Sequence, residues 1–160
     1  MRGTLFTVGL GPGDPDLMTV KAARIIATAP VIAYFAKRGR AGHARGIVEG
    51  HTHPAAEELR LEYPFTTEIA LDDPRYAEGI GAFYESCAAR VAESLDAGQD
   101  VALLCEGDPF FYGSAMYVFD RLAAARARPA SRRARHRSRA PARPPAPPPR
   151  ESWRGCAPLS

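Results

Sequence analysis

Three short apolar runs constrain the fold of this chain more than any other feature of its sequence. None of them alternates polar with apolar residues, so each predicts a strand that is buried on both faces. Between the first two runs, apolar residues recur at helical spacing after Thr19, which can cap a helix. A strand, a helix and a second strand in this order predict a βαβ unit of a parallel sheet. The three runs are residues 4–10 (TLFTVGL), 31–35 (VIAYF) and 101–105 (VALLC).

The clearest helical pattern lies between Asp73 and Gly98. Asp73 can cap the helix and Pro74 suits its first turn, while Gly98 suits a left-handed C-terminal cap. Another helix is predicted over residues 114–124, and polar alternation predicts an edge or half-exposed strand over residues 59–63. The apolar stripe of the helix between Asp73 and Gly98 comprises Tyr76, Ile80, Phe83, Cys87, Val91 and Leu95.

Together these elements predict an α/β domain, a mostly parallel sheet with flanking helices, over residues 1–125. The composition changes after this segment. Residues 1–125 contain 11 Lys and Arg against 17 Asp and Glu, whereas residues 126–160 contain 10 Arg against one Glu, and 8 of the 15 prolines. The second segment has too few large apolar residues to offset the entropy of ordering it. We therefore expect residues 126–160 to be a disordered, Arg/Pro-rich tail.

The cysteines and histidines argue against a disulfide framework and against a metal site. Cys87, Cys105 and Cys156 are odd in number and far apart, which predicts a reducing, cytoplasmic location. His51 and His53 have no further ligand-type residue at metal-binding spacing, so we expect surface histidines and no metal. The apolar run near the N-terminus is too short for a signal peptide or a membrane span, so we expect no membrane partner.

Two loops that follow predicted buried strands have the composition of ligand-binding loops: residues 9–15 (GLGPGDP) and 106–114 (EGDPFFYGS). Ligands of open α/β sheets bind beyond the carboxyl ends of the strands, and glycine lets a ligand approach the backbone closely. Asp14 and Pro15 stand where a phosphate-binding loop needs Lys and Ser or Thr, and no acidic residue ends the 31–35 run to hold a ribose. Nucleotide phosphate binding is therefore disfavoured, and a tight turn of ordinary turn residues remains the alternative.

Longer stretches around the two loops resemble a known family. GLGPGDPDLMTVKAARII (residues 9–26), YPFTTE (residues 63–68) and DVALLCEGDPFFYGSAMYVFDRL (residues 100–122) are similar to the class III S-adenosylmethionine-dependent methyltransferases that modify tetrapyrroles in cobalamin synthesis. The resemblance covers residues 3–123. It implies the first of two α/β domains, with S-adenosyl-L-methionine bound in the cleft between them. A small-molecule tetrapyrrole is the implied substrate, and full-length relatives are implied to be homodimers.

The resemblance also implies a set of site residues. Asp108 is implied to lie near the polar end of the cofactor, and Phe111 and Tyr112 near its adenosyl group. Asp14 is implied to lie on the substrate side, where a carboxylate could accept the proton that leaves the methylated carbon. The alternative for Asp14 is stabilisation of the N-terminus of the following helix. The implied cofactor-binding residues are Pro12, Gly107, Asp108, Phe111 and Tyr112.

A basic segment follows the second predicted strand. Tetrapyrroles of this pathway carry many carboxylates, and cations near the cleft could bind them. A solvated basic loop is the alternative on charge alone. The candidate substrate-binding residues are Lys37, Arg38, Arg40 and Arg45.

The family continues beyond residue 123 with a strand and a second domain, which the rest of this sequence does not resemble. Arg, Ala, Pro and Ser are what GC-rich DNA encodes when it is translated out of frame, so we expect an out-of-frame tail. We expect the chain to be the N-terminal half of a methyltransferase and to be inactive by itself. The alternative is a small α/β domain whose arginines bind nucleic acid, or whose prolines bind a protein. Trp153 is the only aromatic residue of the tail available for base stacking, which disfavours nucleic acid.

Overall fold

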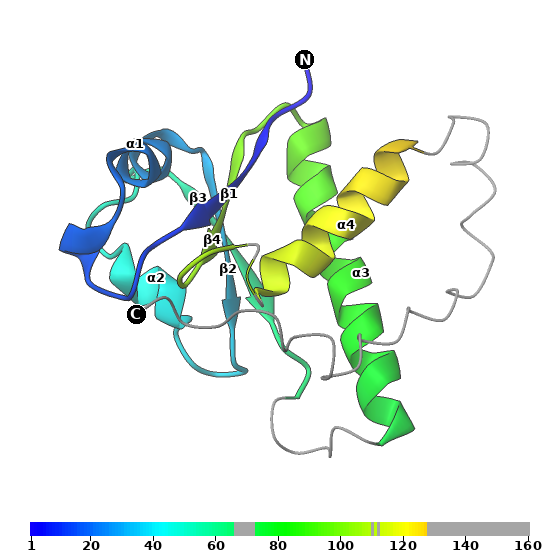
Figure 1. The fold of residues 1–160 in the computed structure, drawn as a ribbon. Coiled ribbons are helices and arrows are strands. Elements are labelled where there is room, and N and C mark those ends of the chain that lie inside the picture. The colour runs from blue at the N-terminus through cyan, green and yellow to red at the C-terminus, as the bar shows by residue number, and fades with distance from the viewer. Residues whose placement is uncertain (66–72, 110, 112, 128–160) are drawn as a thin grey trace, which may run out of the picture.

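The computed structural model of the chain contains one sheet with helices on both faces (Figure 1). Three predictions from the sequence fall outside the residues that the structure describes: the role of Tyr112, the end of the YPFTTE stretch and the tail from residue 128 onward. The described residues are 1–65, 73–109, 111 and 113–127.

Four parallel strands form the sheet, in the order β1-β4-β2-β3. β2 and β4 are central, which explains why nearly all their residues are buried, as their uninterrupted apolar sequences predict. β3 lies at an edge and buries Leu59 and Leu61, as its alternating sequence predicts. The strands are β1 (Leu5–Gly9), β2 (Val31–Ala36), β3 (Glu57–Glu62) and β4 (Val101–Cys105).

The two longest helices, α3 and α4, lie on one face of the sheet, and α1 and α2 lie on the other (Figure 1). β1, α1 and β2 form the predicted βαβ unit, and α4 continues three residues beyond the predicted end at residue 124. No helix among the described residues is long and apolar enough to cross a membrane. The helices are the short 3-10 helix η1 (Pro15–Leu17), α1 (Val20–Thr28), α2 (His43–Ile47), α3 (Pro74–Asp96) and α4 (Ser114–Ala127).

The ends of α1 and α3 confirm the predicted caps. Thr19 Oγ1 accepts a hydrogen bond from the Ala22 N–H at 3.1 Å. Asp73 Oδ1 accepts one from the Arg75 N–H at 2.9 Å. Gly98 adopts a φ of +85°, the left-handed conformation in which a helix such as α3 ends. α1 therefore begins, and α3 begins and ends, where residues next to the helix provide the cap.

An apolar cluster packs on each face of the sheet. Along β2, Ile32 faces α1 and α2, whereas Val31 and Ala33 face α3 and α4. Two free cysteines, Cys87 and Cys105, are buried in the cluster that faces α3 and α4. Burial raises the pKa of both thiols to about 12. Both thiols therefore stay neutral and pack as small apolar side chains.

Candidate functional site at the carboxyl edge of the sheet

The loops that follow β1 and β4 lie side by side at the carboxyl edge of the sheet. The two strands are neighbours, and the Leu10 N–H donates a hydrogen bond to the Cys105 carbonyl at 2.9 Å. Beyond the strands, the Gly107 N–H donates to the Gly11 carbonyl at 2.9 Å and forms an isolated antiparallel bridge. Two motifs that are far apart in the sequence therefore form one continuous surface.

The backbone of this surface requires glycine. A Cβ atom at Gly9 would lie 2.6 Å from the Gly107 carbonyl oxygen, so a side chain there would force the two loops apart. Gly11 and Gly107 adopt φ values of +74° and +65°, which favour glycine. Around Gly13 and Gly107, no described atom would lie within 4 Å of an added Cβ. Their backbone faces open space, where a ligand can approach it closely.

Four of the cofactor-binding residues implied by the resemblance, Pro12, Gly107, Asp108 and Phe111, belong to the two loops that form this surface. Pro12 and Asp108 are exposed, and Phe111 exposes 69% of its surface. The Phe111 N–H donates to the Asp108 carbonyl at 3.1 Å, so a turn keeps the two residues close together. The surface combines open backbone, a carboxylate and an exposed aromatic ring, which suits a ligand that has both charged and aromatic parts.

Asp14 lies at the end of the first loop and caps η1. Its Oδ1 atom accepts a hydrogen bond from the Asp16 N–H at 2.9 Å, and the residue is exposed. The contact agrees with the alternative interpretation of Asp14, in which its carboxylate stabilises the start of a helix. Proton transfer by Asp14 stays a prediction.

The basic turn after β2 lies at the same edge of the sheet. Its residues Lys37, Arg38 and Arg40 are exposed, and the Arg40 N–H closes the turn by donating to the Lys37 carbonyl at 3.0 Å. The guanidinium of Arg60, on β3, donates hydrogen bonds to the carbonyls of both Lys37 and Arg40. The backbone of the turn is thus attached to the sheet while its cationic side chains face solvent.

Arg45 differs from these residues because it has a charge partner. Its Nε atom lies 2.7 Å from Glu58 Oε1, and the Tyr34 hydroxyl donates to Glu58 Oε2 at 2.7 Å. The hydrogen bond from Tyr34, followed by that from Arg45, holds the pKa of the Glu58 carboxyl below its usual range. Arg45 therefore joins α2 to β3, and its charge is already compensated.

A second contact joins α2 to the loop after β4. His43 Nδ1 lies 3.4 Å from Glu106 Oε2, and both side chains are exposed. This contact brings the segment after β2 next to the loop that contains Gly107 and Asp108. Within the described part of the chain, no group of three or more His, Cys, Asp and Glu residues is placed to hold a metal ion.

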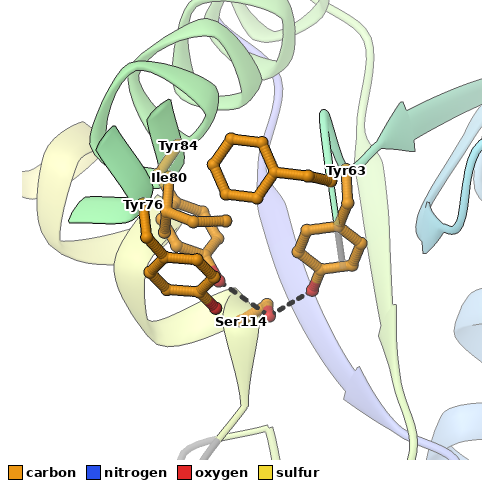
Figure 2. A pocket seen from close by; sticks show the side chains of 6 residues that line it. Tyr63, Tyr76, Ile80, Tyr84 and Ser114 are labelled. Atoms are coloured by element: carbon orange, nitrogen blue, oxygen red, sulfur yellow. Dashed lines mark hydrogen bonds between the residues drawn. The ribbon is translucent and has the colours of Figure 1, made fainter. Parts of the chain in front are cut away.

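The sequence did not predict a pocket between the end of β3 and the helices α3 and α4. The cavity has a volume of about 270 Å³. Figure 2 shows the Ser114 hydroxyl between the hydroxyls of Tyr63 and Tyr84. The oxygen of Ser114 lies 2.5 Å from that of Tyr63 and 3.0 Å from that of Tyr84. Burial raises the pKa of both tyrosines. The lining residues are Tyr63, Phe65, Tyr76, Ile80, Tyr84 and Ser114.

This pocket escaped prediction for a definite reason. Tyr84 lies beside the apolar stripe of α3 rather than in it, and no local pattern indicates that Tyr63 and Ser114 meet. The one available sign was that Tyr63 and Ser114 both belong to the stretches on which the family resemblance rests.

Comparisons with known proteins cover the same part of the chain. Residues 4–129 match the family of Tetrapyrrole (Corrin/Porphyrin) Methylases. Over 121 residues the chain is 54% identical to the Precorrin-2 C(20)-methyltransferase of Sinorhizobium sp, a match that covers 76% of this chain and 49% of that protein. It is also 50% identical over 121 residues to the Cobalamin biosynthesis protein CobIJ of Mycobacterium tuberculosis (strain ATCC 25618 / H37Rv). That match covers 76% of this chain and 24% of CobIJ.

The fold is also similar to a solved structure. The X-ray structure of the cobalamin biosynthetic enzyme cobalt precorrin-4 methyltransferase, CbiF, matches with a TM-score of 0.52 at 25% identity, over 76% of this chain and 41% of that one. This similarity confirms the predicted α/β fold. The chain spans about half the length of the Sinorhizobium relative and a quarter of the Mycobacterium one. Because the family match covers most of its residues, the chain belongs to the tetrapyrrole methylase family.

Proposed function

We propose that this chain is the N-terminal half of an S-adenosylmethionine-dependent methyltransferase that methylates C-20 of precorrin-2 in cobalamin biosynthesis. The observation that supports this proposal most is the 54% identity to a precorrin-2 C(20)-methyltransferase. The solved methyltransferase with a similar fold, whose name gives precorrin-4, is only 25% identical. The difference favours precorrin-2 as the substrate over other tetrapyrroles.

S-adenosyl-L-methionine is the proposed cofactor, and the paired loops after β1 and β4 are its proposed site. When bound, this cofactor supplies an electrophilic methyl group. The open backbone at Gly107 would allow close approach, and the Asp108 carboxylate would accept hydrogen bonds from the charged end of the ligand. The rings of Phe111 and Tyr112 would cover its aromatic part. Pro12 would face the same cleft and keep the first loop in a fixed shape.

Asp14 is the proposed proton acceptor. A meso carbon that gains a methyl group must afterwards lose its proton, and a carboxylate within reach can take it. The hydrogen bond from the Asp16 N–H to Oδ1 holds the Asp14 side chain in one orientation at the edge of the site. Asp14 would thus combine the capping of η1 with proton transfer.

The exposed turn after β2 is the proposed binding site for the carboxylates of the macrocycle. Lys37, Arg38 and Arg40 are cationic and lie at the same edge of the sheet as the paired loops. Arg45 is proposed to contribute less, because the carboxylate of Glu58 already compensates its charge.

Methyl transfer is proposed to require a second domain. The proposed site is exposed in this chain, and methyl transfer from a sulfonium needs a dry cleft with two walls. We propose that the sequence from residue 128 onward is out of frame and does not supply the second wall. Residues 126 and 127, which the composition assigns to the tail, belong to α4. The whole enzyme is proposed to be cytoplasmic and homodimeric, which fractionation and sedimentation analysis would test.

The test joins residues 1–127 to the second half of the Sinorhizobium relative and supplies S-adenosylmethionine with a labelled methyl group. We expect one label per molecule of precorrin-2, located at C-20 by NMR, and no transfer by the 160-residue chain alone. A parallel reaction with cobalt-precorrin-2 shows whether the metal is tolerated. Labelling at another ring position, or no labelling by a folded hybrid while the Sinorhizobium enzyme is active, would contradict the proposal.

A further inference from the structure

A cluster of three hydroxyls lies where β3, α3 and α4 meet. Ser114 is the first residue of α4, Tyr63 directly follows β3, and Tyr84 lies on α3. The Ser114 hydroxyl is 2.5 Å from that of Tyr63 and 3.0 Å from that of Tyr84. Dashed lines mark both hydrogen bonds in Figure 2. The start of α4 is therefore bonded to two elements that are distant from it in the sequence.

The connection from β4 to α4 is attached at both of its ends. At the first end, the Gly107 N–H donates to the Gly11 carbonyl. At the second end, the Ser114 hydroxyl is hydrogen-bonded to the hydroxyls of Tyr63 and Tyr84. Asp108 and Phe111 lie between these two attachments, at the carboxyl edge of the sheet.

The connection is also compact. A Cβ atom at Gly113 would lie 2.8 Å from the Pro109 carbonyl oxygen, so Gly113 packs directly against the backbone that follows Asp108. The Phe111 N–H donates to the Asp108 carbonyl within the same turn. Because the packing is close, a displacement of Ser114 should also displace Pro109 and Asp108.

We propose that Ser114, held by the hydroxyls of Tyr63 and Tyr84, is a positioning residue that fixes Asp108 and Phe111 at the carboxyl edge of the sheet. The link to catalysis rests on the proposed function, in which these two residues bind the cofactor. The proposal gives a physical reason for two motifs of this sequence: Tyr63 begins YPFTTE, and Ser114 ends EGDPFFYGS.

The chemistry of the cluster fits a holding role rather than proton transfer. Burial is the largest cause that raises the pKa of Tyr63 and of Tyr84, so both phenols stay protonated at neutral pH and remain hydrogen-bond donors. The ring of Tyr84 is itself fixed, since it stacks on Tyr117 at 4.7 Å and lies 5.5 Å from the Arg121 guanidinium. Arg121 in turn pairs with Glu85 at 3.1 Å.

The test measures amide hydrogen exchange in the 160-residue chain, where no ligand is needed. The Phe111 N–H reports on the connection, and the Ala29 N–H, bonded to the Ile25 carbonyl on the other face of the sheet, is the internal reference. Ser114→Ala removes both hydrogen bonds and should speed exchange at Phe111 about tenfold relative to Ala29. Tyr63→Phe removes one bond and should have about a threefold effect.

Two variants serve as controls for this experiment. Ser114→Thr keeps the hydroxyl, so exchange at Phe111 should return to the parent rate. Tyr117→Phe removes an exposed phenol one turn along α4 and should leave the Phe111 rate unchanged. Equal acceleration at Phe111 and Ala29, or failure of Ser114→Thr to restore the rate, would overturn the positioning role.

Catalysis is measured separately in the joined enzyme described above. Ser114→Ala should lower kcat/KM for S-adenosylmethionine about two- to tenfold and leave KM for precorrin-2 unchanged, because a small displacement of Asp108 weakens a directed bond. An unchanged kcat/KM would overturn the link between the cluster and the cofactor. If the parent joined enzyme is inactive but exchange at Phe111 responds as expected, the proposed function fails and the holding role of Ser114 stands.

Discussion

The inside of the sheet and its carboxyl edge differ in side-chain burial and in backbone conformation. In β2 and β4 the side chains are apolar and buried on both faces, and ordinary strand backbone suffices. At the carboxyl edge, Pro12, Asp108 and Phe111 are exposed, and Gly11 and Gly107 have left-handed backbone. Stability and ligand contact should therefore depend on different residues, and substitutions in the two regions should change different measurements.

The largest effect is expected inside the sheet. Ile32 is fully buried against α1 and α2, so Ile32→Ala should lower the free energy of unfolding by about 2 to 5 kcal/mol through lost burial and a cavity. Urea unfolding measures this loss. Val20→Ala on α1 is the control, because Val20 is 67% exposed and should change the free energy by about 0.5 kcal/mol or less. Similar losses for the two variants would mean that burial does not separate them.

At the carboxyl edge, Asp108→Ala should act on ligand binding instead. A hydrogen bond to a charged group contributes about 1.5 to 3 kcal/mol, so the Kd for S-adenosylmethionine in the joined enzyme should rise roughly ten- to hundredfold. Calorimetric titration gives this value, with Asp120→Ala, an exposed carboxylate on α4, as the control. An unchanged Kd would remove Asp108 from the cofactor site.

Gly107 belongs to the edge but should also affect stability. Its φ of +65° suits glycine, and no described atom would contact an added Cβ, so Gly107→Ala isolates the cost of the backbone conformation. That cost is about 1 to 2 kcal/mol. Gly46→Ala in α2 should have the opposite sign and stabilise by roughly 0.5 to 1 kcal/mol, because Gly46 is helical and also has open space. Destabilisation by both variants, measured by urea unfolding, would show that the turn geometry is not the cause.

The sequence predicted the elements whose causes are local. The caps at Thr19, Asp73 and Gly98 are formed by residues next to the helices that they end, so the sequence alone locates them. The two site loops were predicted because the glycines that a tight backbone requires are visible in the sequence. They were identified as one site only through the family resemblance.

The contacts that the sequence could not predict are those that depend on the order of strands in the sheet. β1 pairs with β4 rather than with β2, and no local pattern records that choice. The ion pair of Arg45 with Glu58 exists because β3 lies beside β2, so Arg45 looked like a free cation in the sequence. The meeting of Tyr63 with Ser114 has the same origin, since it joins the end of an edge strand to a helix that follows a central one.

The exposed turn after β2 should affect substrate capture with a smaller energy. In the joined enzyme, changing both Arg38 and Arg40 to Gln should raise KM for precorrin-2 about two- to tenfold, since exposed charge interactions are worth about 0.2 to 1 kcal/mol each. The Kd for S-adenosylmethionine should not change, and added salt should reduce the effect on KM. Arg24→Gln, an exposed cation on α1, is the control. A rise in the cofactor Kd instead would place the turn against the cofactor rather than the macrocycle.

The smallest effect concerns Glu58, on the edge strand of the sheet. Hydrogen bonds from Tyr34 and Arg45 hold the pKa of its carboxyl below the usual 4.5 in the folded chain, so its charged form stabilises the fold at neutral pH. That contribution should be lost as the pH falls below about 4.5 and through the lower folded pKa, because the unfolded chain binds the proton first. Glu58→Gln should therefore be less stable than the parent at pH 7, by at most about 1 kcal/mol because the pair is partly exposed, and nearly equal to it at pH 3. Urea unfolding at the two pH values measures this difference. Glu58→Gln should not change the rate of methyl transfer in the joined enzyme, because Glu58 connects β2, β3 and α2 and is not among the proposed ligand-binding residues. A difference that persists at pH 3 would mean that the shape of the side chain, and not its charge, holds α2 against the sheet.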